Sequence, residues 1–282
     1  MVLMYYNKYV ALVEMFEGET DMKSNIKFDM HCHTDEGSLD GKVEIADYIK
    51  LLKSQGFGGM LVTDHDSYNG FRYYRDNLKE KTKDFVVLKG IEYDTVDAGH
   101  ILVILPKDVK LPIMECRGLP VKLLIDIVHR HGGILGPAHP CGERHLSFTR
   151  TRAYKKNPDI MKRFDFLEAF NSCESVNSNM NARRLAFEYK LSMFGGSDSH
   201  STDCIGTAYT VFKEDIQTED DLINYVKERK ALDYGGTYYQ GTVKEKIGVL
   251  NHVLVEGFWF YNRFASLYRG HKRRAALALL KH

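Results

Sequence analysis

Histidine and acidic residues follow the ends of several short apolar runs in this chain of 282 residues. Imidazole and carboxylate groups are the ligands that zinc, manganese and iron take in proteins. Several carboxylates together favour more than one ion, and paired ions support hydrolytic chemistry. The apolar runs 28–30, 60–62, 85–88, 134–135 and 193–194 precede, in order, His31 and His33, Asp64 and His65, Glu92, His139, and Asp198 and His200, and a sixth run, 101–105, follows His100.

These runs have the composition of buried strands in a parallel sheet. In α/β proteins, ligands and catalytic groups gather where the carboxyl ends of such strands meet. His31 and His33 are two residues apart, so on a strand both rings face one side and can reach one ion. Ordinary cores do not place histidine at the ends of so many strands. The pattern therefore predicts a metal cluster.

Such a cluster suits the hydrolysis of a phosphate ester. Two ions about 3.5–4 Å apart can hold a phosphoryl oxygen, generate hydroxide near neutral pH and stabilise the leaving oxygen. The sequence has no GxSxG nucleophile elbow, no P-loop and no GxGxxG motif, so acyl-enzyme, nucleoside triphosphate and dinucleotide chemistry lack support. We expect two to three divalent ions of manganese, zinc or iron and a metal-activated hydroxide.

Helix-like segments alternate with the apolar runs along the chain. The run 166–170 adds a further strand, which gives about seven strands between residues 27 and 195. Alternating strands and helices over this length predict an α/β fold with a parallel sheet or barrel. The expected helices cover residues 43–55, 121–131, 175–190 and 218–229.

Composition and net charge narrow the partners and the cellular compartment that we expect for the protein. The net charge of +1 argues against the whole molecule being a binder of polyanions. The five cysteines form no CxxC pair, which suits reduced thiols in a cytosol. Residues 1–20 lack a small-residue cleavage site, and no run reaches the roughly 18–20 apolar residues that span a bilayer. We expect a cytoplasmic protein without a membrane span.

The two ends of the chain differ from the alternating part. Residues 1–26 are expected to form an N-terminal arm or helix, and residues 235–282 a C-terminal helical extension that is aromatic and, after Glu256, free of acids. One interpretation of the extension is a helix packed on the domain or at a dimer contact. The other is a contact with nucleic acid or a membrane surface. The sequence leaves the oligomeric state open.

The motifs HxH, TDH, GxE, HIL, AHP and GSDSH, which occur in this order between residues 27 and 200, resemble those of the PHP (polymerase and histidinol phosphatase) superfamily. The resemblance implies a distorted (β/α)7 TIM-like barrel over residues 27–234, with a trinuclear metal centre at the carboxyl ends of its strands. It also implies metal-dependent phosphoesterase activity.

By position, the resemblance implies three ion sites that share one glutamate. We expect Glu92, Asp198 and His200 to take part in catalysis as well as in metal binding, and Asp198 or His200 could assist proton transfer. The implied ligands are His31, His33, Glu92 and Asp198 for the first ion, Asp40, His65 and His200 for the second, and Glu92, His100 and His139 for the third.

The second ion site departs from the family pattern. Many relatives place an acid or histidine five or six residues after the second histidine of HxH, where this chain has Ser38 and Leu39. Asp40 follows one residue later and is the expected ligand, with Asp35 or Glu36 as the alternative. Glu168 resembles a recurrent acid of the family and is expected to support a ligand rather than to bind metal.

A phosphoesterase also needs cations for the phosphate oxygens, and the planar guanidinium of arginine suits that role. We expect Arg144, close to His139, and Arg183 to bind substrate. The leading function is hydrolysis of a phosphomonoester or phosphodiester, with a nucleotide-like or other small phosphate as substrate. Alternatives are a nuclease that acts on nucleic acid ends, a non-catalytic metal-binding scaffold module, and a metallohydrolase of C–N or C–O bonds.

Overall fold

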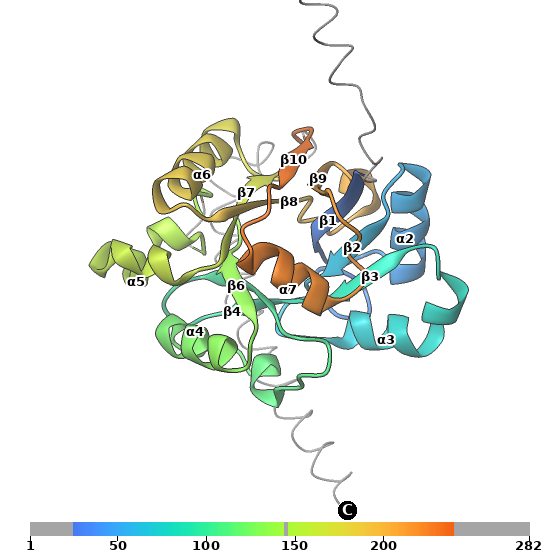
Figure 1. Ribbon diagram of the computed structural model, residues 1–282, viewed down its shortest axis with the longest axis horizontal. Coiled ribbons are helices and arrows are strands. Elements are labelled where there is room, and N and C mark those ends of the chain that lie inside the picture. The colour runs from blue at the N-terminus through green and yellow to red at the C-terminus, as the bar shows by residue number, and fades with distance from the viewer. Residues whose placement is uncertain (1–24, 144–145, 240–282) are drawn as a thin grey trace, which may run out of the picture.

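The computed structural model of the protein describes residues 25–143 and 146–239 (Figure 1). These residues form a mixed α/β fold in which helices surround centrally placed strands (Figure 1). The strands are β1 (Ile26–Cys32), β2 (Gly59–Val62), β3 (Val86–Lys89), β4 (Ile91–Asp94), β5 (His100–Ile104), β6 (Ile134–Pro137), β7 (Phe166–Asn171), β8 (Ser192–Gly196), β9 (Ala208–Phe212) and β10 (Asp233–Gly236). The α-helices are α2 (Ile45–Ser54), α3 (Asn69–Asn77), α4 (Val121–Arg130), α5 (Arg152–Lys156), α6 (Val176–Tyr189) and α7 (Glu219–Lys227).

Hydrogen bonds place the described strands in three sheets, with the orders β10-β9-β1-β2-β3, β4-β5-β6 and β7-β8. The pairs β1–β2, β2–β3 and β7–β8 are parallel, as expected, but β4–β5 and β5–β6 are antiparallel. The expected parallel arrangement is wrong for β4 and β5 because a tight turn, in which Thr95 N donates to Gly99 O at 3.0 Å, joins them in place of a crossover helix. The chain then passes through α4 and returns in β6, antiparallel to β5. Gly99 has a φ of +69°, a conformation that favours glycine.

Most expected elements are present. The predicted strands correspond to β1, β2, β3, β5, β6, β7 and β8, and the predicted helices to α2, α4, α6 and α7. The strand β4 was not expected by itself, so Glu92 lies within a strand and not after the end of run 85–88. The reason is that the chain leaves one sheet and enters another at Gly90, between β3 and β4.

Buried residues at helical spacing explain the helices. In α4, Val121, Leu124, Ile125 and Val128 are buried, which is one apolar stripe facing the strands. The first turn of α7 is fixed by a capping box between Thr218 and Asp221.

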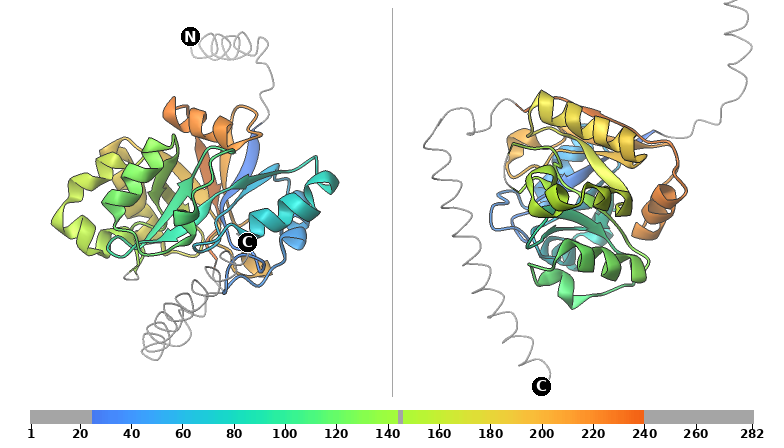
Figure 2. Two further views of the ribbon diagram at one scale, coloured as in Figure 1. Left: turned by 90° about the horizontal axis from the view of Figure 1, so that it is seen from below. Right: turned by 90° about the vertical axis from the view of Figure 1, so that its left-hand side faces the viewer.

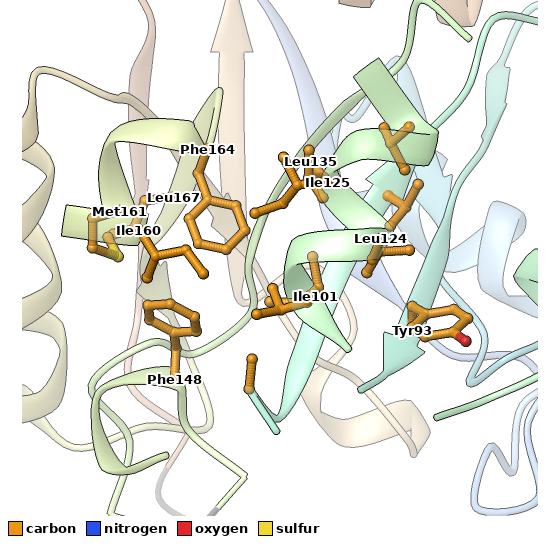
Figure 3. Close-up of a cluster of buried hydrophobic side chains, with 14 of the residues drawn as sticks. Tyr93, Ile101, Leu124, Ile125, Leu135, Phe148, Ile160, Met161, Phe164 and Leu167 are labelled. Carbon is orange, nitrogen blue, oxygen red and sulfur yellow. The ribbon is translucent and has the colours of Figure 1, made fainter. Parts of the chain in front are cut away.

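Apolar side chains form an interior cluster among the strands and further clusters beneath the helices. Successive residues of β5 and β7 belong to different clusters. Leu102 and Phe166 join the interior cluster, whereas Ile101 and Leu167 join the cluster under α4 and α6. Figure 3 shows this outer cluster, with Ile101 and the α4 residues Leu124 and Ile125 close together. Helix α7 lies at one end of the strands (Figure 2, left) and contributes Leu222, Ile223, Tyr225 and Val226 to the interior cluster.

Some expectations concern residues outside the described ranges. Residues 1–24 of the expected arm, residues 240–282 of the expected extension and Arg144 lie there. The expected boundary at residue 235 falls within β10, which pairs with β9. Among the residues that the structure describes, no helix combines the length and apolar character needed to cross a membrane.

Candidate metal centre

A β-bulge turns the two histidines of β1 toward the interior. The register of β1 against β2 shifts between Asp29 and Cys32. Met30 belongs to the interior cluster, whereas Asp29 contacts Tyr48 of α2 on the outer side. Without the bulge, alternation would place His31 on the outer side with Asp29, so the extra residue re-aims this ring. His31 and His33 thereby share the interior space.

A first group of donor atoms forms around these two rings. His31 Nε2 lies 3.4 Å from Glu92 Oε2 and 3.5 Å from Asp198 Oδ1. His33 Nε2 lies 3.3 Å from each of the same two oxygens. Ligand atoms bonded about 2.1 Å from a tetrahedral zinc ion lie about 3.4 Å from one another. The spacing of these atoms is compatible with one ion held by His31, His33 and Asp198, with Glu92 Oε2 beside both rings.

A second group of donor atoms contains Asp40, for which the sequence offered Asp35 or Glu36 as the alternative. Asp40 Oδ2 lies 3.5 Å from His65 Nε2 and 3.3 Å from His200 Nε2. Glu36 does not take this place, because its carboxylate accepts the backbone N–H of Ile45 at 3.2 and 3.1 Å, at the start of α2. Asp35 is exposed to solvent. The structure thus favours Asp40 over both alternatives.

Glu92 lies between the donor groups and connects them. Its Oε1 is 3.0 Å from His100 Nδ1 and 3.1 Å from His139 Nε2. Its Oε2 is 3.1 Å from His65 Nδ1, so the His65 ring faces Glu92 with one nitrogen and Asp40 with the other. All nine predicted ligands therefore lie in one continuous cluster. Sets that could hold an ion are His31, His33 and Asp198; His33, Asp40, His65 and His200; and His65, Glu92 and His100.

The antiparallel direction of β5 explains how His100 reaches the cluster. His100 opens β5, and its Cα pairs with that of Asp94 near the end of β4. The end of β6 lies on the other side, where Ala138 N donates to His100 O at 3.2 Å. His139 and Asp198 follow β6 and β8 and have φ values of +29° and +52°. Non-glycine residues with positive φ are uncommon, and such strain collects at functional sites.

Glu168 supports the cluster from β7, as expected. Its Oε1 lies 2.8 Å from His31 Nδ1, and its Oε2 accepts the backbone N–H of His139 at 2.5 Å. Asn171 was not recognised from the sequence, yet its Nδ2 donates at 3.1 Å to both Glu168 Oε2 and Asp198 Oδ2. The only available signal was its place at the end of the strand.

Ser38 and Asp64 form a second support. Ser38 Oγ lies 3.2 Å from His33 Nδ1 and donates to Asp64 Oδ1 at 3.1 Å. Asp64, which the TDH motif placed beside His65, instead accepts from the backbone N–H of Thr34 at 2.7 Å. Burial raises the pKa of Asp64 to about 7. Asp64 therefore organises the loop after β1, while His65 faces the donor cluster.

Charges within the cluster stabilise one another. Burial raises the pKa of Glu92, but the neighbouring His100, His65 and His31 outweigh this effect and hold it well below its usual value. Burial lowers the pKa of His31, but the carboxylates of Glu168, Asp198 and Glu92 outweigh it and raise the pKa well above the ordinary one. Imidazole rings and carboxylates thus lie next to one another throughout the site.

Several buried atoms of the cluster lack a hydrogen bond of acceptable geometry within the described part of the chain. A buried polar atom without a partner costs about 1–3 kcal/mol, so such atoms indicate a missing ligand when they point to one place. The donor set of imidazole nitrogens and carboxylate oxygens fits zinc, manganese or iron. These unpaired atoms are His31 Nε2, His33 Nε2, Asp40 Oδ1, Glu92 Oε2 and His100 Nδ1.

Among the described residues, no hydrogen bond or ion pair joins the expected substrate arginine, Arg183, to this cluster. The guanidinium of Arg183 lies over the rings of Phe170 and Tyr234, 5.8 and 5.6 Å from their centroids. A different arginine, Arg117, pairs with Asp94 and has its Nε 3.8 Å from Asp66 Oδ2. Because Asp66 follows His65 in the chain, Arg117 lies beside the cluster, and no motif in the sequence marked it.

Two family models match this chain. The model described as PHP domain matches residues 29–172, and the one described as PHP-associated matches residues 176–231. An uncharacterized protein of Methanocaldococcus jannaschii is 32% identical over 101 residues, which are 35% of this chain and 42% of that protein. The match therefore spans less than half the length of this curated relative.

Solved structures share the fold at low identity. PsfC from Pseudomonas syringae has a TM-score of 0.57 and 15% identity, over 76% of this chain and 92% of that one. A protein of Bifidobacterium adolescentis, provisionally assigned as a metal-dependent phosphoesterase, has a TM-score of 0.51 and 15% identity, over 72% and 96%. An amidohydrolase from Chromobacterium violaceum has a TM-score of 0.50 and 12% identity, over 72% and 97%. These similarities concern the fold alone.

Proposed function

Because this chain belongs to the PHP domain family, we propose that it is a metal-dependent phosphoesterase that hydrolyses a phosphomonoester or phosphodiester. The observation that carries the proposal is the set of unpaired donor atoms, which the fold gathers from strands and loops far apart in the sequence. In a purely structural role, these five buried atoms would stay without a hydrogen bond of acceptable geometry, at a cost in free energy. Metal ions remove that cost.

We propose three ion positions within the cluster. The first lies between the rings of β1 and the loop after β8, the second near the loop after β1, and the third beside β5 and β6. Glu92 would be shared by the first and third positions, because its Oε2 faces His31 and its Oε1 faces His100. The proposed ligands are His31, His33, Glu92 and Asp198; Asp40, His65 and His200; and Glu92, His100 and His139.

Bound ions at these positions would activate water and stabilise the negative charge of the phosphoryl group. The chain's own groups select which nitrogen of each ring is available. Glu168 Oε1 accepts a hydrogen bond from His31 Nδ1 at 2.8 Å, which leaves Nε2 free as a ligand. The carbonyl of Asp198 does the same for His200, whose Nδ1 lies 2.9 Å from it. Asn171 Nδ2 fixes the Asp198 carboxylate at 3.1 Å.

We also propose that the three sheets belong to a distorted seven-stranded barrel. Two isolated parallel bridges support this, because they connect the sheet that contains β1 and β2 with the other two sheets beside the ligands: Cys32 with Ser199, and His65 with Glu92. The interior cluster of apolar residues, with β1, β5, β7 and β8 all contributing, supports it too. The antiparallel β5 would be the distortion.

The test is turnover of small phosphate esters by the full chain loaded with Mn²⁺, Zn²⁺ or Fe²⁺. We expect hydrolysis of p-nitrophenyl phosphate or of its bis ester. The double variant His31→Ala/His33→Ala should lose both activity and bound metal, because it removes two ligands of the first position. Equal rates in this variant would assign the activity to a contaminant, and inactivity of the metal-loaded wild-type protein across a broad panel of esters would refute the proposal.

A further inference from the structure

Strands β1 and β8 carry ligands side by side without a regular ladder between them. Within the described residues, an isolated bridge between Cys32 and Ser199 joins the two segments. Asp198 N donates to His31 O at 2.9 Å, and His33 N donates to Ser199 O at 3.3 Å. Before this point, the backbone of β1 pairs with β9 over Ile26, Lys27 and Phe28, and not with β8.

The side chain of Asp29, and not a strand ladder, joins this part of β1 to the segment that follows β8. Its Oδ1 accepts the backbone N–H of Ser197 at 2.9 Å and that of His31 at 3.3 Å. Its Oδ2 accepts from Ser197 Oγ at 2.5 Å and from Tyr48 Oη at 3.5 Å. Asp29 is fully buried, as is Ser197. One carboxylate therefore binds both ligand-bearing segments and α2.

We infer that Asp29 is a positioning residue for the first ion position, because it sets the distance between the β1 rings and the Asp198 carboxylate. Ser197 and Asp198 are adjacent, as are Met30 and His31, so a shift at the Asp29 contact moves ligands on both sides of the ion. The distance that such a shift would change is the 3.3 Å between His33 Nε2 and Asp198 Oδ1. This inference rests on the proposed metal centre but not on the phosphoesterase reaction.

The position of Asp29 makes its effect selective. His100 and His139, proposed for the third ion, come from β5 and from the loop after β6. His100 pairs with Asp94 of β4 and accepts from Ala138 N, and the backbone N–H of His139 donates to Glu168 Oε2. None of these contacts involves Asp29. Loss of Asp29 should therefore weaken one ion position and spare the third, which a general loss of stability would not do.

The experiment measures metal binding by the full chain, without using turnover. Metal content is determined after dialysis against Mn²⁺, and stepwise affinities by competition with a coloured chelator. We expect Asp29→Ala to weaken one ion by about 10- to 100-fold, the cost typical of removing a group that orients a metal ligand. Asp29→Asn should stay close to the wild-type protein, because its amide oxygen can still accept from Ser197 N and its NH₂ can donate to Ser197 Oγ.

A matched control distinguishes positioning from stability. Glu219 is another buried carboxylate that accepts a backbone N–H, that of Lys89 at 2.6 Å, and it lies outside the cluster. Glu219→Ala should lower the melting temperature while all ion affinities stay unchanged. If Asp29→Ala does not fold, Ser197→Ala is used instead. It removes the contacts of the hydroxyl with Asp29, Tyr48 and His31 O but keeps the backbone N–H of residue 197, and it should weaken the same ion about two- to tenfold.

Unchanged affinities in Asp29→Ala, or equal weakening of every ion, would overturn the inference, as would a wild-type protein that binds no metal. A wild-type protein that binds metal but hydrolyses no ester would refute the proposed reaction, while the selective effect of Asp29→Ala would still support the positioning role.

Discussion

The candidate metal centre and the surroundings of Lys89 both bury charged groups, but these groups find hydrogen-bond partners to different extents. Lys89 Nζ donates to the carbonyls of Lys107 at 2.9 Å, Val109 at 3.3 Å and Pro106 at 3.4 Å. Every proton of that ammonium group has an acceptor. In the cluster, by contrast, His31 Nε2, Glu92 Oε2 and other buried atoms have no hydrogen bond of acceptable geometry among the described residues.

This difference separates a structural use of buried charge from a functional one. A fully bonded group such as Lys89 joins segments of the chain and needs nothing further. A set of unpaired donors that converge on one place costs free energy until a ligand arrives. Substitutions in the two regions should therefore affect different properties, metal binding in one and folding stability in the other.

The largest effect is expected from Glu92→Gln. Glu92 contacts histidines of every proposed position, and its two oxygens cannot be replaced by an amide that offers one donor and one acceptor. We expect a loss of at least about 100-fold in metal affinity and turnover, beyond what outer groups cost. Metal analysis after dialysis measures this. Full metal content in the variant would contradict the bridging role.

A smaller effect on the same region is expected from Glu168→Ala. The variant removes the acceptor for His31 Nδ1 and for the backbone N–H of His139. Metal affinity should fall about 10- to 100-fold, and Glu168→Gln should recover part of it. A chelator titration checks both variants, and a stronger loss than in Glu92→Gln would instead make Glu168 a direct ligand.

The structural use of buried charge is tested by Lys89→Met. The apolar side chain leaves the carbonyls of Pro106, Lys107 and Val109 without this donor, and we expect a loss of roughly 1–3 kcal/mol in the free energy of unfolding. Metal content should not change. Urea denaturation of the metal-loaded protein measures the loss. A fall in metal content with unchanged stability would contradict the purely structural role of Lys89.

The smallest effect is expected from Arg183→Met. The guanidinium of the half-buried Arg183 lies over Phe170 and Tyr234, and such a cation–π contact contributes on the order of 1 kcal/mol. Stability should fall by that amount with no change in KM for a phosphate ester. A raised KM at unchanged stability would restore the substrate-binding role that the sequence suggested for this residue.

Much of the cluster was predictable because it depends on strand periodicity. The HxH spacing and the positions of His65, His139 and Asp198 after apolar runs required nothing beyond the local chain. The separate strand β4 was not predictable, because Gly90 gives no sign that the following residues change sheet. The supports Ser38 and Asn171 were missed for a related reason: their partners are distant in sequence.

The sequence by itself therefore determined which residue types could bind metal and in which order they occur along the chain. Only the tertiary structure decided how they meet. The bulge in β1, the reversed direction of β5 and the contact of Asp29 with Ser197 all depend on neighbouring strands. Local periodicity sets which side a residue faces, whereas hydrogen bonds between distant strands set the distances that a metal ion requires.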